Sequence, residues 1–271
     1  MRVLTPNTLD EALNMMAGMP PPIPVAGGTD LLVSWHHKPK DDWTLLDLSR
    51  LGGPLRSLRL NAVELVIGAL TTYWDVLCNA DVCAAFPLLA TAARQVGAVQ
   101  IQMRGTWAGN IANGSPAADG VPVILAYDAF VRLQSNAGTR EVPLDQFWTG
   151  YKQTVRRLDE LIVGIRLPRR RRDLEYFEKV GARSAQTISK VGVAAVHDEQ
   201  GWRIAASSVA PFVCRCRHLE AALAAGRKFS NPSELRAVLA QDIQPIDDIR
   251  STAAYREVVL SRLLFHRLAG S

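Results

Sequence analysis

The chain has 271 residues, of which 48% are hydrophobic and 21% are charged, and its formal net charge at pH 7 is +5. These values are ordinary for a globular protein, so they exclude a disordered, collagen-like or coiled-coil chain. The sequence has no apolar run of the roughly 20 residues that a membrane span needs, and no signal-peptide core near its start. We therefore expect a cytoplasmic protein with one large domain or two ordinary ones.

The first third of the chain alternates predicted helices with short strands. Thr8 followed by Glu11 is the pattern of a capping box, which predicts a helix that ends near residue 17. The prolines that follow would end this helix, and the apolar run 23–26 then predicts a strand that leads into a glycine turn. Further strands are expected over 43–48 and 63–69, and further helices from Thr72 and over 87–96.

Segment 97–114 has four glycines and two asparagines but no long periodic run. Such a segment predicts a functional loop or a set of tight turns. Ser115 followed by Pro116 fits the start of a helix, which we expect to reach about residue 127.

Strands dominate the next part of the chain, and helices dominate the last part. Strands are predicted over 129–134, 139–142, 160–167, 174–180, 188–197 and 202–209, with a hairpin turn at 198–201. Helices are predicted over 218–225, over 232–240 behind the cap Asn231, and over 252–268. The domain boundary is expected at 168–173.

Five arginines crowd around Pro168, at Arg166 and at positions 169–172. Such a run could contact phosphate, but no aromatic residues alternate with it and no helix-turn-helix or zinc-finger spacing accompanies it. A solvated linker between domains is therefore the favoured interpretation, and nucleic acid is not an expected partner.

Cysteines and histidines give no sign of a metal site. The cysteines form a C-x4-C pair and a C-x-C pair, which we interpret as thiols rather than zinc or iron-sulfur ligands, at Cys78, Cys83, Cys214 and Cys216. The histidines form no spaced cluster and receive no catalytic role; they are His36, His37, His197, His218 and His266.

Two glycine-bearing segments are the candidate ligand sites: VAGGTD at 25–30 and RGTWAGNIANGSPAAD at 104–119. Glycine lets a backbone approach a ligand closely, and consecutive free N–H groups attract anions such as phosphate. Neither segment matches the Rossmann or P-loop pattern. From spacing alone, ordinary surface turns explain them equally well.

With FEKVGAR at 177–183 and ISKVGVAAV at 188–196, these segments resemble the FAD-binding subunit of the molybdenum hydroxylases, the xanthine dehydrogenase and carbon monoxide dehydrogenase family. The resemblance covers essentially the whole chain. It implies an α+β fold: an FAD-binding domain of the vanillyl-alcohol-oxidase type over 1–170, with subdomains at about 1–56 and 57–170. A C-terminal α+β domain over 171–271, with a three-stranded antiparallel sheet and helices, would close over the flavin.

The resemblance also implies which residues bind the cofactor. The first pyrophosphate loop would comprise Val25, Ala26, Gly27, Gly28, Thr29 and Asp30, followed by Leu31. The second would comprise Gly105, Thr106, Gly109, Asn110, Asn113 and Ser115. Asp119 would hold ribityl or ribose hydroxyls, Leu161 and Ile162 would pack on the flavin ring, and Lys179 would lie near the isoalloxazine. No catalytic residue and no metal ligand is implied.

Two departures from the family pattern concern the cofactor. Ile23 and Pro24 stand where a lysine is common, so one counter-charge for phosphate is missing or comes from elsewhere. Trp107 and Ala108 replace an apolar residue and a glycine, which is expected to add bulk beside the cofactor.

The expected function is that of an oxidoreductase subunit that carries FAD and transfers electrons. The expected partners are a large molybdopterin-binding subunit and a small subunit with two [2Fe-2S] clusters, and the flavin would pass electrons to NAD or another acceptor. Two alternatives remain open, namely a stand-alone flavin oxidoreductase of the same fold and a flavin-free assembly subunit.

Overall fold

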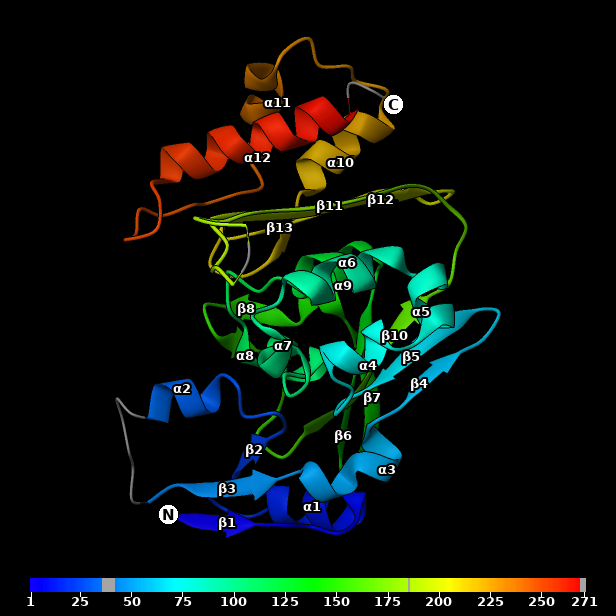
Figure 1. Ribbon diagram of the computed structural model, residues 1–271, viewed down its shortest axis with the longest axis vertical. Helices are drawn as coiled ribbons and strands as arrows, with labels where there is room; N and C mark the ends of the chain where they lie inside the picture. The colour runs from blue at the N-terminus through cyan, green and yellow to red at the C-terminus, as the bar shows by residue number, and fades with distance from the viewer. Residues whose placement is uncertain (36–41, 185, 269–271) are drawn as a thin grey trace.

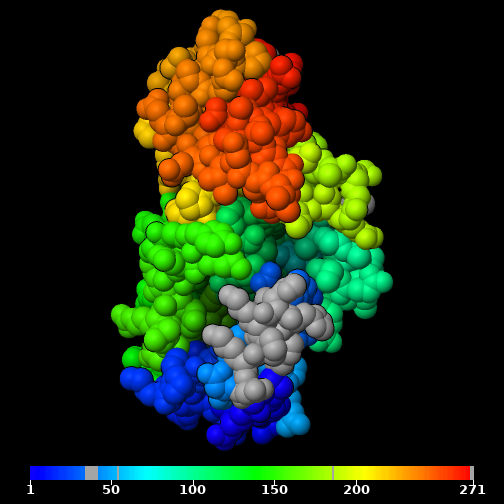
Figure 2. Space-filling view, turned by 90° about the vertical axis from the view of Figure 1, so that its left-hand side faces the viewer, coloured from blue at the N-terminus to red at the C-terminus, as the bar shows by residue number. Residues whose placement is uncertain are grey.

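The computed structural model describes residues 1–35, 42–184 and 186–268. Within these ranges, every helix is too short or too polar to cross a membrane. The N-terminal strands and the C-terminal helices lie at opposite ends of an elongated molecule (Figure 1). The space-filling view in Figure 2 shows the same order, with cyan and green segments between the blue and red ends.

The N-terminal end is a three-stranded parallel sheet in the order β1-β3-β2, built from β1 (Arg2–Leu4), β2 (Ile23–Val25) and β3 (Thr44–Asp47). Helix α1 (Leu9–Met16) buries Leu13 and Met16 in a small core that includes Leu46. The hydroxyl of Thr8 accepts the Glu11 N–H at 3.1 Å, as predicted, but the Glu11 carboxylate accepts from Asn7 N–H rather than from Thr8. Helix α2 (Leu31–Trp35) follows the first glycine turn.

The middle of the molecule is an antiparallel sheet in the order β4-β5-β10-β6-β7. Its strands are β4 (Leu58–Leu60), β5 (Glu64–Gly68), β6 (Phe130–Ser135), β7 (Gly138–Pro143) and β10 (Leu161–Pro168). The helices around it are α3 (Gly52–Leu55), α4 (Tyr73–Leu77), α5 (Ala80–Ala85), α6 (Pro87–Gln95), α7 (Val99–Gln102), α8 (Trp107–Asn113) and α9 (Val121–Ala126). Short elements complete it, namely η1 (Ser49–Leu51), η2 (Leu144–Gln146), β8 (Trp148–Gly150) and β9 (Gln153–Thr154).

The C-terminal sheet lies between two layers of helices (Figure 1). Its strands, in the antiparallel order β11-β12-β13-β14, are β11 (Arg172–Val180), β12 (Val191–Asp198), β13 (Gly201–Ser207) and β14 (Cys214–Arg215). Val191, Val193 and Ala195 pack in one core with α10 (Arg217–Ala224), α11 (Pro232–Leu239) and α12 (Ala253–Leu268). Ala194 and Val196 pack in the core that contains α6 and α9. Both faces of β12 are therefore buried.

The predicted three-stranded C-terminal sheet is wrong in one detail, because the described part of the chain adds β14 as a fourth strand. Cys214 pairs with Ala206, and Arg215 pairs with Ala205. A strand of two residues is too short to give a periodic signal in sequence.

The prediction for segment 97–127 is also wrong in part. The segment contains two short helices, α7 and α8, rather than loops alone. The hydroxyl of Thr106 accepts the Gly109 N–H at 2.9 Å and caps α8, which ends at Gly114 with φ of 59°. The next helix begins at Val121 instead of Ser115, whose hydroxyl accepts the Ala117 N–H at 3.3 Å in a local turn.

The arginine run is not the solvated linker that was predicted. Arg170 forms an ion pair with Asp128 at 3.0 Å. The guanidinium of Arg172 lies 4.5 Å from the ring centre of Phe86 and 4.4 Å from that of Tyr127. These contacts attach the start of β11 to α5, α6 and α9, so part of the run has a structural role.

The cysteines and histidines have ordinary surroundings where the structure describes them. All four cysteines are free, and burial raises the pKa of Cys214 to about 12 and also raises that of Cys216. His197 contacts Asp173 at 2.8 Å, and His218 contacts Asp242 at 2.8 Å. His36 and His37 lie outside the described residues.

Candidate cofactor site

A cavity of about 500 Å³ lies where segments 24–31, 101–113 and 156–162 meet. This volume is within the usual range for small-molecule sites, about 300–1,000 Å³. Most of the predicted binding residues line it: Val25, Ala26, Gly27, Gly28, Thr29, Asp30, Leu31, Gly105, Thr106, Gly109, Asn110, Asn113, Leu161 and Ile162. Ser115, Asp119 and Lys179 do not.

The first glycine turn provides free backbone donors to this cavity. The N–H groups of Gly27, Gly28 and Thr29 form no hydrogen bond with any described residue. A Cβ on Gly27 would lie 1.8 Å from the Arg104 carbonyl oxygen, so only glycine lets the two segments touch here. Gly28 has φ of +73°, a left-handed conformation that favours glycine. The turn is thus shaped to present N–H groups to an anion.

The second segment is held against the start of α4. Thr72 and Thr106 form an isolated β-bridge, and the Tyr73 N–H donates to the Gly105 carbonyl at 3.3 Å. Its Gly109 N–H is already satisfied by the Thr106 hydroxyl, so this donor is not free for a ligand. The Oδ1 atom of Asn110, by contrast, is buried at the cavity and has no hydrogen-bond partner among the described residues. A buried acceptor without a partner is costly, so a ligand donor would be favoured there.

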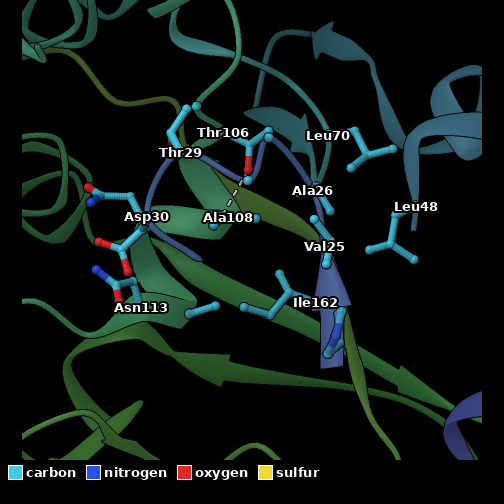
Figure 3. Close-up of a pocket in the computed structure, with 18 of the residues that line it drawn as sticks. Val25, Ala26, Thr29, Asp30, Leu48, Leu70, Thr106, Ala108, Asn113 and Ile162 are labelled. Atoms are coloured by element: carbon cyan, nitrogen blue, oxygen red, sulfur yellow. Dashed lines mark hydrogen bonds between the residues drawn. The ribbon is translucent and has the colours of Figure 1, made fainter. Parts of the chain in front are cut away.

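The cavity has an apolar end and a polar end (Figure 3). The side chains of Val25, Leu48 and Leu70 gather on one side, whereas Asp30 and Asn113 lie on the other. This division suits an elongated ligand with a flat apolar group and a polar group.

Asp119 and Lys179 are paired with each other rather than placed in the cavity lining. Lys179 Nζ lies 2.7 Å from Asp119 Oδ2 and 2.8 Å from the Gln95 carbonyl oxygen, and the Ser189 hydroxyl donates to Asp119 Oδ1 at 2.6 Å. Burial raises the pKa of Asp119 above its ordinary value, although Lys179 and Ser189 oppose this shift. The pair joins β11 of the C-terminal sheet to the segment between α8 and α9.

Sequence reasoning did not select several residues that line the cavity. The most polar are Tyr73, Arg156 and Glu160, and the apolar ones include Leu48, Leu70 and Ile101. Tyr73 follows the predicted cap Thr72, but nothing in that pattern says where its ring points. Arg156 precedes the predicted strand 160–167 and Glu160 is its first residue, and charged residues are common at such positions.

Trp107 corrects another expectation, since it adds no bulk beside the cavity. Its side chain is fully buried, is absent from the cavity lining, and packs against Tyr73 with ring centres 4.8 Å apart. The extra volume is accommodated in the core behind α8.

Comparison with protein families identifies the chain. Residues 1–170 match the FAD binding domain in molybdopterin dehydrogenase, and residues 176–269 match the CO dehydrogenase flavoprotein C-terminal domain. The chain belongs to this family of FAD-binding molybdopterin dehydrogenase proteins. The predicted family, the oxidoreductase class and FAD as the cofactor are thereby confirmed.

Individual relatives agree with this assignment. The chain is 30% identical to the xanthine dehydrogenase FAD-binding subunit of Escherichia coli O157:H7, over 92% of this chain and 88% of that protein. It is also 30% identical to the carbon monoxide dehydrogenase medium chain of Hydrogenophaga pseudoflava, over 89% and 85% of the two chains. The chain also superposes on a solved structure of carbon monoxide dehydrogenase from the same organism, one that lacks the Mo-pyranopterin moiety of the molybdenum cofactor. The TM-score is 0.88 at 30% identity, and the match covers 98% of this chain and 95% of that chain. The α+β fold is therefore also confirmed.

The residues around the cavity fit FAD. Its diphosphate requires several donors, and the first glycine turn offers three consecutive N–H groups that no described residue occupies. A hydroxyl of FAD could donate to the buried Asn110 Oδ1. Its flat rings require apolar walls, which the Val25, Leu48 and Leu70 side of the cavity provides.

Proposed function

We propose that this chain is the FAD-carrying electron-transfer subunit of a molybdopterin-dependent hydroxylase in the cytoplasm. A large partner subunit would oxidise the substrate at molybdopterin, and a small partner would deliver electrons through [2Fe-2S] clusters. NAD or another acceptor would receive them. The observation that carries the proposal is the meeting of both glycine segments at one cavity that has free N–H donors and an unpaired acceptor.

The chain's own residues bind and orient the cofactor rather than break bonds. FAD, when bound, supplies the redox chemistry by accepting electrons and passing them on. The Gly27, Gly28 and Thr29 N–H groups would hold anionic oxygens, and the apolar end would exclude water. We assign Leu161 and Ile162 to ring packing, and the Asp119–Lys179 pair to the local charge near the flavin.

We also propose two domains, 1–170 for FAD binding, with subdomains at about 1–56 and 57–170, and 171–271 for closure over the flavin. The separate cores support this division in part, because α10, α11 and α12 have a core of their own. The other face of the C-terminal sheet shares a core with α6 and α9, which supports a fixed rather than a loose attachment.

The first experiment is the visible absorption spectrum of the purified chain, with acid release of the chromophore and its identification as FAD or FMN. The Gly28→Val variant should lose most of the flavin, because a β-branched residue at φ of +73° is strained and its Cβ would crowd Leu32. Gly53→Val is the matched control, since a Cβ at Gly53 meets nothing within 4 Å. It should retain the flavin.

Each outcome has a clear meaning. Released FAD that is lost in Gly28→Val but retained in Gly53→Val supports the proposal. The next experiment is then co-purification of the chain with its partner subunits. Substrate turnover by the isolated flavoprotein would favour the stand-alone oxidoreductase. A colourless chain that takes up no added FAD would contradict the proposal and favour an assembly subunit.

A further inference from the structure

We infer that Arg156 binds the diphosphate of the cofactor. The inference rests on the proposed function, because it takes FAD to be the ligand of the cavity. It concerns a residue outside both glycine segments, and its evidence is independent of the glycine pattern.

Arg156 is a half-buried cation at the cavity whose hydrogen-bonding capacity is mostly unused. Its Nη1 atom donates to the carbonyl oxygen of Glu160 at 2.6 Å and to that of Arg157 at 3.1 Å. Its Nε and Nη2 atoms have no partner among the described residues. The two carbonyl contacts fix the guanidinium in place, and several N–H groups remain to bind a ligand.

No carboxylate of the described chain forms an ion pair with Arg156. The nearby Glu160 carboxylate is already occupied, because Arg140 donates to its two oxygens at 2.6 and 2.9 Å and the Arg157 N–H donates at 2.7 Å. Burial lowers the pKa of Arg156, although Glu160 and Asp159 oppose this shift. A desolvated guanidinium without a counter-ion is costly, so an anion of the ligand would stabilise it.

Arg156 is also the one cation in the described lining of the cavity, where the other charged groups are Asp30 and Glu160. Strand β2 supplies no cation, because its residues are Ile23, Pro24 and Val25. A diphosphate is the anionic part of FAD, and a planar guanidinium can bind two phosphate oxygens at once. The free N–H groups of the first glycine turn and Arg156 would thus share one anionic group.

Binding of ADP and adenosine to the flavin-free chain tests the inference, with FAD binding measured in parallel by calorimetry. ADP contains the diphosphate without the flavin, and adenosine lacks both. Arg156→Gln should weaken ADP and FAD binding about 10- to 100-fold and leave adenosine binding nearly unchanged. Arg156→Lys should bind ADP more weakly than the unmodified chain but more tightly than Arg156→Gln, because lysine retains the charge but lacks the planar guanidinium.

Arg157→Gln is the matched control, since Arg157 is the exposed neighbour and does not line the cavity. It should bind ADP as the unmodified chain does. Equal losses for ADP and adenosine in Arg156→Gln would indicate a structural role and overturn the inference, as would unchanged ADP binding. A chain that binds ADP through Arg156 but no FAD would contradict the proposed function alone, whereas a chain that binds neither would contradict both.

Discussion

At the scale of single residues, the Asp119–Lys179 pair is the most informative contact outside the cavity. The side chains of Lys179 and Asp119 are only 4% and 13% exposed. Charges that are this buried need each other, because removal of one partner leaves the other desolvated and unpaired. Removal of either charge alone is therefore expected to destabilise the chain, even without flavin.

Lys179→Met should lower the free energy of unfolding of the flavin-free chain by about 3–5 kcal/mol, because the Ser189 hydroxyl is then the one partner left to the Asp119 carboxylate among the described residues. The double variant Lys179→Met/Asp119→Asn should lose less unfolding free energy than Lys179→Met alone, since it leaves neither charge of the pair without its partner. Urea unfolding of Lys179→Met, of Asp119→Asn and of the double variant measures the three losses of stability. Additive losses in the double variant would mean that the pair has no coupling energy.

Most of the residues that line the cavity could be predicted from the sequence, whereas the ion pair between Asp119 and Lys179 could not. Gly27 and Gly28 are visible in sequence as a glycine pair, although only Gly28 is restricted by its own φ, whereas Gly27 is restricted by contact with Arg104. Lys179 and Asp119 are 60 residues apart, and no local pattern says that they meet. Arg156 was missed for the same reason, since its burial depends on segments far away in sequence.

At the scale of elements, helix α4 holds the second glycine segment in place. Thr72 and Asp75 form a full capping box, and Arg56 donates to both oxygens of Asp75 at 2.7 and 2.8 Å. Burial alone would raise the pKa of Asp75, but hydrogen bonds from Arg56 and Thr72 outweigh it and hold the pKa below its ordinary value. The ionised carboxylate is thus favoured in the folded chain.

Asp75→Asn should lower the free energy of unfolding by about 1 kcal/mol at neutral pH, because it removes the charge of the capping residue. Since the pKa of Asp75 is lower in the folded chain than in the unfolded chain, its contribution is complete above about pH 4 and is lost as the pH falls further. The difference between the variant and the unmodified chain should therefore shrink in acid. A constant difference in urea unfolding from pH 7 to the acid limb would contradict this account.

Element type was predictable where periodicity or a cap was strong. The caps at Thr8, Thr72 and Asn231 precede real helices. Helices α7 and α8 were not predicted because a glycine-rich segment of low periodicity gives no helical signal, and tertiary contacts with α4 hold it. Strands β1, β4, β8, β9 and β14 are short, so their pairing depends on neighbours rather than on their own residues.

At the scale of the whole molecule, Arg172 connects the C-terminal sheet to helices α5, α6 and α9 of the middle part. Besides its two aromatic contacts, it donates to the carbonyl oxygens of Ala85 at 3.0 Å and Pro168 at 3.2 Å. Nearby, the Tyr127 hydroxyl donates to Glu175 at 2.6 Å, which adds a second link between α9 and β11. The position of the C-terminal sheet relative to α6 and α9 depends on such links.

Arg172→Ala should therefore lower the free energy of unfolding by about 2–4 kcal/mol, through lost hydrogen bonds and lost contact with Phe86 and Tyr127. Arg171→Ala is the control from the same run, because Arg171 is exposed, and it should change stability by less than about 0.5 kcal/mol. Thermal and urea unfolding measure the change in stability of each variant. Equal effects of the two substitutions would restore the linker interpretation of the arginine run.

The order of strands in the middle sheet has a consequence for synthesis on the ribosome. Strands β4 and β5 are near neighbours in sequence, as are β6 and β7, so each pair can form as soon as it emerges. Strand β10 is made last of these five strands and inserts between the two pairs, and it contributes Leu161 and Ile162 to the cavity lining. A nascent chain that ends before β10 therefore has both glycine segments but lacks part of the cavity lining, and the cavity can be completed only after residue 162 has left the exit tunnel.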